Sequence, residues 1–176
     1  MRFIQIPTPK LAEQVLETRE HIQEVAERYA DAEDSFFIGR GYLYPAALEG
    51  ALKLKEISYV HAEGYHAAEL KHGPIALLDE KVPVIALLND IPGKAKTLGN
   101  VQECRARNAP VIGVGATGDD SITRLCNDCI RVPRTSPYIT PVTTVIALQL
   151  FSYYVARARG CEIDQPRNLA KSVTVE

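Results

Sequence analysis

The sequence predicts an α/β fold, a three-layer α/β/α sandwich around a mostly parallel sheet of about five strands. Short apolar runs alternate along the chain with segments of helical periodicity. Within the runs, apolar residues follow one another without polar alternation, as expected for strands covered by helices on both faces. The length of 176 residues predicts one domain. We place that domain at residues 1–160 and a C-terminal tail at 161–176.

The first half of the chain contains two expected strands and three helical segments. In order, they are a leading helix over about 11–30, a strand at 35–38, a helix at 45–57, a strand at 59–62 and a helix or helical turn at 67–78. Pro45 should open its helix, because proline is favoured in the first turn. The segment 67–78 is interrupted by Gly73-Pro74.

The second half of the chain repeats the alternation. Its expected elements are a strand at 82–88, a helix at 94–107, a strand at 110–114, a short helix at 121–126, a strand at 129–132 and a long apolar helix at 140–159. Ser121 is a possible cap of the short helix. Gly160 is a suitable C-cap for the last helix.

Composition and charge exclude several classes of protein. The net charge is −2, with acids and bases mixed along the chain, so the basic surface of a nucleic-acid binder is absent from the sequence. The most apolar stretch, 141–155, is broken by Thr143, Thr144 and Gln149 and is too short to cross a membrane. Residues 1–7 lack the apolar core of a signal peptide. We therefore expect a cytoplasmic protein whose partners are neither nucleic acid nor membrane.

Two motifs are ambiguous. Cys126 and Cys129 form a CxxC, but zinc would need two further ligands, and a redox CxxC usually opens a helix whereas this one precedes a strand. Buried free thiols are favoured over a metal or redox site, so no metal is expected.

Residues 113–118 match G-x-G-x-x-G, yet Asp119 and Asp120 would place negative charge where a pyrophosphate docks. A plain turn is favoured over a nucleotide site.

The helix at 45–57 carries a charged stripe. At 100° per residue, Glu49, Lys53 and Glu56 fall within about 60° of one another. The other directions around this helix are mostly apolar, so the stripe faces either solvent or a pocket. It is either a ladder of ion pairs on a solvated face or a carboxylate whose basicity is set by a neighbouring lysine.

A histidine and the tail supply further candidates. His72 lies at the expected helical break, where it suits general acid/base work or a structural role. Residues 165–176 show neither helical period nor strand alternation, but Leu169 and Val173 make them more apolar than a frayed end. We expect an ordered path that presents Lys171. This lysine is either a carbonyl-trapping amine or a solvated terminal residue.

Three segments resemble one enzyme family, the glutamine–fructose-6-phosphate aminotransferases, also called glucosamine-6-phosphate synthases. They are residues 47–58, residues 69–74 and the tail from 164 to 176. The similarity extends from about Ala12 to Glu176 and is weak around 89–135. The family has a glutaminase domain followed by two sugar isomerase (SIS) domains, and this chain is similar to the second SIS domain plus the tail. The resemblance implies the flavodoxin-like SIS fold.

The resemblance also implies a set of catalytic roles. Glu56 would shuttle a proton between C1 and C2 of the sugar, Lys53 would assist it, and Glu49 would be a supporting acid. His72 would promote ring opening in the active site of the partner subunit. Lys171 would form a Schiff base with the ketose carbonyl.

Further expectations follow from the same resemblance. Ala170 joins Lys171 in binding the sugar phosphate, the chain forms a homodimer, and no metal or organic cofactor is needed. We expect Glu56 and Lys171 to converge on one hollow at the rim of the sheet, beyond the carboxyl ends of the strands, where such sheets bind ligands.

The chain departs from the family pattern in two respects. Met1 is followed by Arg2, so the cysteine nucleophile of the glutaminase is missing. The hydroxyl-rich loop that holds the substrate phosphate in the first SIS domain is also missing, and the turn at 38–41 offers only one arginine. The chain is therefore expected to be a fragment of a longer enzyme or a half that needs a partner. The alternatives are a stand-alone phosphosugar isomerase or deglycase and a non-catalytic module that senses a phosphosugar.

Overall fold

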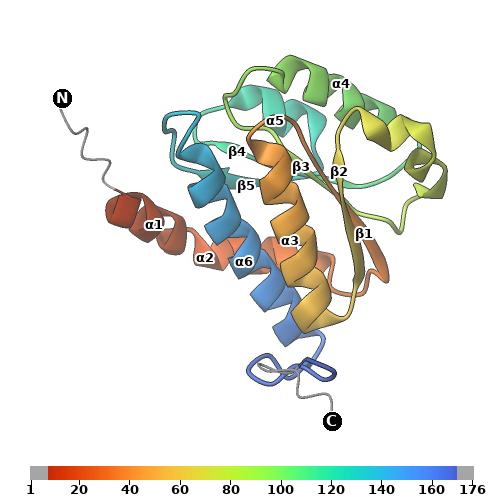
Figure 1. The fold of residues 1–176 in the computed structure, drawn as a ribbon, viewed down its shortest axis with the longest axis vertical. Helices are drawn as coiled ribbons and strands as arrows, with labels where there is room; N and C mark the ends of the chain where they lie inside the picture. The colour runs from red at the N-terminus through yellow and green to blue at the C-terminus, as the bar shows by residue number, and fades with distance from the viewer. Residues whose placement is uncertain (1–7, 170–176) are drawn as a thin grey trace, which may run out of the picture.

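The computed structural model describes residues 8–169, which fold around a five-stranded parallel sheet (Figure 1). The strands are β1 (Asp34–Gly39), β2 (His61–His66), β3 (Val84–Leu87), β4 (Val111–Ala116) and β5 (Asp128–Val132). Their order in the sheet is β2-β1-β3-β4-β5, and every neighbouring pair is parallel. The fold class predicted from the sequence is confirmed.

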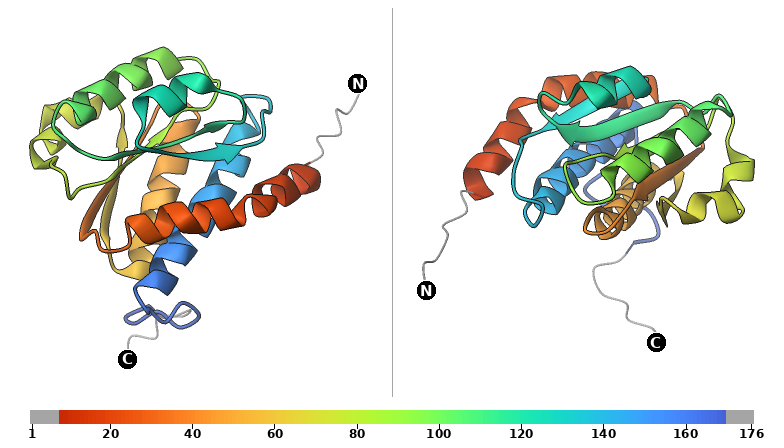
Figure 2. Two further views of the ribbon diagram at one scale, coloured as in Figure 1. Left: turned by 180° about the vertical axis from the view of Figure 1, so that it is seen from behind. Right: turned by 90° about the horizontal axis from the view of Figure 1, so that it is seen from above.

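Helices cover both faces of the sheet (Figure 2). One layer contains α1 (Thr8–Glu17), α2 (Arg19–Arg28), α3 (Leu43–Ser58) and α6 (Thr140–Ala158). The other contains α4 (Lys94–Arg105), α5 (Asp120–Leu125) and the 3₁₀ helices η1 (Glu69–His72) and η2 (Pro74–Leu77). Successive strand residues face opposite layers: Phe37 and Ile85 pack in the first core, Phe36 and Val84 in the second.

The connectivity gives the two edges of the sheet different surroundings. The chain passes from β1 to β2 on one side and then crosses back over to β3 on the other side of β1. The carboxyl edge between β1 and β3 is therefore the topological switch point. Both α3 and α6 begin at this carboxyl edge and run back to the amino edge (Figure 1). Residues 161–169 follow α6 and therefore lie at the amino edge, next to the last turn of α3.

The leading helix is two helices instead of one. α1 ends at Glu17 and α2 begins at Arg19. Thr18 separates them, since both its amide and its hydroxyl bond the carbonyl of Val15, at 3.0 and 2.8 Å. A threonine that bonds the backbone locally competes with continued helix, which the apolar periodicity alone does not reveal.

Three boundaries differ from the predicted ones. α3 starts at Leu43, so Pro45 is its third residue, where a missing amide still costs no helical bond. β2 runs over His61–His66 because Tyr59, at φ 61°, ends α3 in the left-handed conformation. The cap of α5 is Asp119, whose carboxylate accepts the amide of Ser121 at 3.0 Å, so the expected Ser121 cap is wrong.

The end of α6 is as expected. Gly160 has φ 67°. Its amide donates to the carbonyl of Arg157, and the amide of Cys161 donates to the carbonyl of Ala156. These are the two bonds of a Schellman motif. The motif turns the chain sharply after α6 and starts the tail back toward α3.

Candidate functional site

The predicted stripe on α3 exists as a chain of ion pairs. The ammonium Nζ of Lys53 donates to Glu56 Oε2 at 2.9 Å and lies 3.7 Å from Glu49 Oε1. The three side chains are half-buried, with 38%, 32% and 28% of the side chain exposed for Glu49, Lys53 and Glu56. The three side chains line up on one side of α3 because residues three and four positions apart are neighbours on a helix surface.

Lys53 is held as a cation in this arrangement. The hydrogen bond to Glu56 raises the pKa of Lys53, burial opposes the rise, and the charges of Glu56 and Glu49 add to it. A permanent positive charge therefore sits between two carboxylates at the surface of α3. The contacts are those of a half-buried ion-pair ladder, and a positioned base with a cation beside it has the same geometry.

The described part of the tail is fastened to the same end of α3. The amide of Arg167 donates to the Tyr59 hydroxyl at 2.8 Å, and the Arg167 guanidinium lies 4.2 Å from the centre of the Tyr59 ring. The Cys161 thiol lies 3.8 Å from the carbonyl of Ser58. Ser58 and Tyr59 follow Glu56 by two and three residues. Ala170 and Lys171 themselves lie outside the described residues.

Glu56 lies at the amino edge of the sheet, so the expectation of a site beyond the carboxyl ends of the strands is wrong for this residue. α3 starts at the carboxyl edge, and Glu56 is in its last turn, about 20 Å farther along the helix axis. The expectation failed because the switch-point rule describes ligands held by loops after the strands, whereas this acid is carried on a crossover helix.

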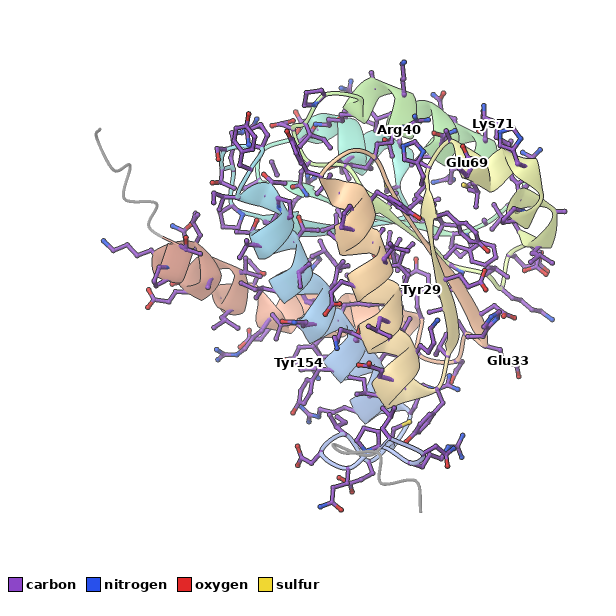
Figure 3. The ribbon with its side chains drawn as sticks, viewed as in Figure 1. Tyr29, Glu33, Arg40, Glu69, Lys71 and Tyr154 are labelled. Carbon is purple, nitrogen blue, oxygen red and sulfur yellow. The ribbon has the colours of Figure 1, made fainter. Side chains whose placement is uncertain are left out.

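The structure does not bring His72 to the stripe within one chain. His72 ends η1, which follows β2 at the carboxyl edge, and Gly73 at φ 144° makes the expected break. Figure 3 shows its neighbours Glu69 and Lys71 near Arg40, at the end of the sheet away from the tail. His72 is exposed, and within residues 8–169 it has no hydrogen-bonding partner.

The switch point contains a charge network that sequence reasoning missed. Lys94 bonds both Asp90, at 2.7 Å, and Asp119, while Arg134 bonds the other oxygen of Asp90. The network lowers the pKa of Asp119: burial opposes this, but hydrogen bonds from Lys94 and Ser121 outweigh it. Lys94 and Asp90 are four residues apart, but Asp119 and Arg134 follow other strands, so no local pattern could join the whole network. The lysine is already paired twice and offers little to a phosphate.

Arg40, the arginine noted in the turn after β1, is also engaged at the switch point. Its guanidinium donates to Asn100 Oδ1 of α4 at 2.9 Å. The neighbouring Asn89 is buried and donates to Thr144 of α6 at 2.8 Å. Polar side chains at the carboxyl edge thus bond one another across α4 and α6.

A cavity of about 600 Å³ opens at the amino edge, near the starts of β1 and β3. Tyr29 and Glu33 mark it in Figure 3. Its charged lining has more acids than bases: Asp31, Glu33, Asp34, Asp79 and Glu80 against Arg28 and Lys81. Such a lining repels a phosphate dianion, and none of the predicted site residues that lie within 8–169 contributes to it.

The glycine motif serves packing. Gly113 and Gly115 lie inside β4, where added Cβ atoms would overlap Ile122 of α5, and at Gly113 the Cys126 thiol as well. The first two glycines therefore belong to a strand, although the sequence favoured a plain turn, and Gly118 at φ 81° forms the turn itself. Close helix–strand contact requires the glycines, and no phosphate cradle is built around them.

The cysteines of the CxxC are free thiols. Burial raises the pKa of Cys126 to about 12 and also raises the pKa of Cys129. Thiols held protonated by burial are poor metal ligands and poor nucleophiles. Within residues 8–169, groups of three or more metal-ligating side chains are absent. No helix in this same range has the length and apolarity to span a membrane.

Comparisons with known proteins agree with the resemblance seen in the sequence. The chain is 55% identical over 162 residues to the glutamine–fructose-6-phosphate aminotransferase (isomerizing) of Chlorobaculum tepidum, covering 92% of this chain and 26% of that protein. It is 54% identical over 168 residues to the same-named protein of Thermus thermophilus, covering 96% and 28%. The chain thus spans about a quarter of the length of these relatives.

Solved structures give the same picture of the fold. The C-terminal domain of the aminotransferase from Francisella tularensis matches with a TM-score of 0.83 at 38% identity, over 90% of this chain and 45% of that one. A tagatose-6-phosphate ketose/aldose isomerase structure from Clostridium novyi, described as putative in its title, matches with a TM-score of 0.81 at 15% identity, which supports the fold alone. The family model of the SIS domain matches residues 28–159, and the chain therefore belongs to the SIS domain family.

Proposed function

We propose that this chain is the isomerase part of a glutamine–fructose-6-phosphate aminotransferase, acting on fructose 6-phosphate to form glucosamine 6-phosphate with ammonia released from glutamine. The observation that carries the proposal is the cluster Glu49–Lys53–Glu56 beside an anchored tail. Relatives of that name share more than half of the residues of this chain. The glutaminase and first SIS domains would belong to the rest of a longer cytoplasmic enzyme.

Glu56 is the proton carrier in this proposal. With the C2 oxygen replaced as an imine by nitrogen from ammonia, one proton moves from C1 to C2 through an enolamine to give the 2-amino aldose, so a single carboxylate that reaches both carbons is sufficient. Lys53 keeps positive charge next to this carboxylate and stabilises the negative charge that develops on the sugar oxygen. Glu49 holds Lys53 from the other side.

Lys171 is the proposed carbonyl trap. Its amine would attack the ketone carbon C2, and water would leave as the Schiff base forms. Ammonia would then add to C2 and displace the lysine amine, which leaves the C2 imine and the free lysine. Four residues separate Arg167 from position 171 and span at most about 14 Å, so the anchor at Arg167 and Tyr59 limits how far position 171 can lie from the last turn of α3. Ala170 would contact the sugar by its place in the tail. His72 would open the sugar ring in the site of a second copy, which requires a homodimer.

The test is exchange of the C1 proton of fructose 6-phosphate with deuterated water, followed by NMR at millimolar sugar. We expect Glu56→Gln to slow exchange by about 10²-fold or more, because the amide cannot accept the proton. Lys55→Met is the matched control, since Lys55 is exposed on the same helix and makes no ion pair among the described side chains. Equal exchange by the Glu56→Gln variant and the wild-type chain would contradict the proposal.

Borohydride trapping tests the Schiff base separately. Reduction in the presence of fructose 6-phosphate should attach the sugar at Lys171, as located by peptide mass spectrometry. Labelling confined to other lysines would remove this role. A chain that binds the sugar but neither exchanges the C1 proton nor traps the carbonyl would instead be a sensing module.

A further inference from the structure

A series of hydrogen bonds crosses the carboxyl edge from the residue after β1 to η1. The Arg40 guanidinium donates to Asn100 Oδ1 at 2.9 Å, and the side-chain amide of Asn100 donates to Glu103 Oε2 at 2.9 Å. The other carboxylate oxygen of Glu103 accepts from Lys71 Nζ of η1 at 3.0 Å. Figure 3 shows the two ends of the series, Arg40 and Lys71, at the same end of the molecule. We call these four side chains the η1 tether.

The α4 end of the tether is held in place independently of Lys71. Asn100 is buried, with 3% of its surface exposed, and both its oxygen and its nitrogen are bonded. The hydrogen bond from Asn100 lowers the pKa of Glu103 most, the bond from Lys71 adds to this, and burial opposes it. A carboxylate already fixed by a buried amide loses little freedom when it pairs with a lysine, unlike the partners of a lone surface ion pair.

The side chains of η1 point in three directions. A 3₁₀ helix has three residues per turn, so successive side chains are about 120° apart and residues three apart eclipse. Leu70 is buried in the second core with 1% of its surface exposed, and Lys71 reaches α4 through Glu103. The third side carries Glu69 and His72, which are both exposed. The directions of Leu70 and Lys71 therefore set the direction of His72.

Few other contacts restrain the rotation of η1. Among residues 8–169, Glu69 and His72 make no hydrogen bond or ion pair. The amide of Ala67 donates to the Gly39 carbonyl at 2.9 Å, which fixes where the chain enters η1 but not how η1 is turned. Without the tether, the apolar contact of Leu70 is left to resist rotation.

We propose that Glu103 is a positioning residue for His72: through Lys71 it fixes the rotation of η1 and keeps the imidazole turned away from its own domain. The inference rests on the proposed function for the chemistry of His72, which is the opening of the sugar ring. Opening breaks the C2–O5 bond, takes the proton from the C2 hydroxyl and places a proton on O5. An imidazole serves this step only within hydrogen-bond reach of the sugar, so its direction matters.

Hydrogen exchange of the η1 amides in the full 176-residue chain tests the placement without turnover. Lys71 and Glu103 are 50% and 38% exposed, and such a pair is worth about 0.5–1 kcal/mol, which corresponds to about 2- to 5-fold in population. Lys71→Met and Glu103→Gln should therefore each raise the exchange rate about 2- to 5-fold. Lys71→Arg should keep the wild-type rate, because its guanidinium also pairs with Glu103.

Lys96→Met is the matched control. Lys96 is exposed on α4 and makes no ion pair among the described side chains, so its loss should leave the exchange of η1 unchanged. Glu103 is 32 positions from Lys71 in the sequence. A rise shared by Glu103→Gln and Lys71→Met therefore reports their contact and not a local change in η1.

A comparison of two sugars tests the consequence for chemistry, by the same C1-proton exchange. Fructose 6-phosphate must open before Glu56 can act, whereas 5-deoxyfructose 6-phosphate lacks the hydroxyl that closes the ring. Lys71→Met and Glu103→Gln should slow exchange about 2- to 5-fold with the first sugar and leave the second unchanged. A general loss of structure would slow both sugars alike. His72→Asn should show the same selectivity with a larger effect, and Lys71→Arg should match the wild type.

Unchanged hydrogen exchange in Lys71→Met would overturn the proposal even if Glu103→Gln fails to fold, since Lys71 is an exposed position. Raised exchange in Lys71→Arg would also overturn it, and so would a selective loss in His72→Asn that the tether variants do not share. If His72→Asn treats both sugars alike, the ring-opening role in the proposed function is wrong. Hydrogen exchange then decides the placement of His72 by itself.

Discussion

Replacing Tyr59 should release the tail from α3. Tyr59→Phe removes the hydroxyl that accepts the Arg167 amide at 2.8 Å, a bond worth about 1 kcal/mol. Tyr59→Leu also removes the ring 4.2 Å from the Arg167 guanidinium, which adds about 0.5–1 kcal/mol. At about 1.4 kcal/mol per tenfold, the detached population should rise about 5-fold for Tyr59→Phe and about 10- to 30-fold for Tyr59→Leu.

Limited trypsin digestion measures this population at the Arg167–Asn168 bond. When the tail opens and closes faster than trypsin cuts, the cleavage rate follows the detached fraction. Tyr138→Leu is the matched control, because Tyr138 is a tyrosine ring 74% exposed at the other end of α6, and its loss should leave the rate unchanged. A Tyr59→Leu variant cut at the wild-type rate would refute the anchoring role of Tyr59.

The same variants connect the anchor to the proposed chemistry. If Lys171 traps the carbonyl, borohydride labelling should fall in the order wild type, Tyr59→Phe, Tyr59→Leu, while the ion pair between Lys53 and Glu56 remains intact. Labelling that stays constant while cleavage rises would separate the anchor from the trap.

Three further predictions concern the scaffold. Gly115→Ala should lower the free energy of unfolding by about 1–3 kcal/mol in urea titration, because its methyl group would overlap Ile122, whereas Gly99→Ala, with open space around it on α4, should be neutral or stabilising. Thr144→Val should cost about 1–3 kcal/mol, since it leaves the buried amide of Asn89 without its 2.8 Å partner, and Thr143→Val should cost less because Thr143 bonds only the backbone of its own helix. Stability should fall between about pH 9 and 12: the buried Cys126 thiol has a pKa of about 12 against 9.0 when unfolded, so the unfolded state loses its proton first as the pH rises. For Cys126→Ala, the free energy of unfolding should fall less steeply with pH than in the wild type, when each variant is compared with its own value at pH 7. Chemical denaturation at each pH measures this, and an unchanged dependence on pH would count against the role of the Cys126 thiol.

The central strands were predictable because burial on both faces leaves an unbroken apolar signal. Residues 35–38, 82–88 and 110–114 became β1, β3 and β4. The edge strand β2 was predicted at 59–62 but lies at 61–66, since its half-buried residues Glu63 and Tyr65 are polar or amphipathic and Tyr59 takes a left-handed conformation. The other edge strand, β5, was predicted at 129–132 and lies at Asp128–Val132, so the error at β2 comes from its mixed composition and the left-handed Tyr59, and not from its place at the edge.

The site contains both contacts that are local in the sequence, which were predicted, and contacts between distant residues, which were not. Glu49, Lys53 and Glu56 were grouped correctly because a helix fixes their relative directions from sequence spacing alone. The contact of Arg167 with Tyr59 joins residues 108 positions apart, and that of Lys94 with Asp119 joins residues 25 apart. No periodicity encodes such pairs, so the anchor and the switch-point network required coordinates.

The positions of Glu56 and His72 restrict how this fold could isomerise a sugar. α3 has 16 residues and is therefore about 24 Å long, and Glu56 lies in its last turn at the amino edge, whereas His72 lies in η1 beyond the carboxyl end of β2. A hexose phosphate is much shorter than that helix, so one molecule of sugar cannot touch both groups of the same chain. A role for both residues in one reaction then requires that one of them come from a second polypeptide. This requirement follows from the parallel sheet itself, because every crossover helix carries its first and last turns to opposite edges.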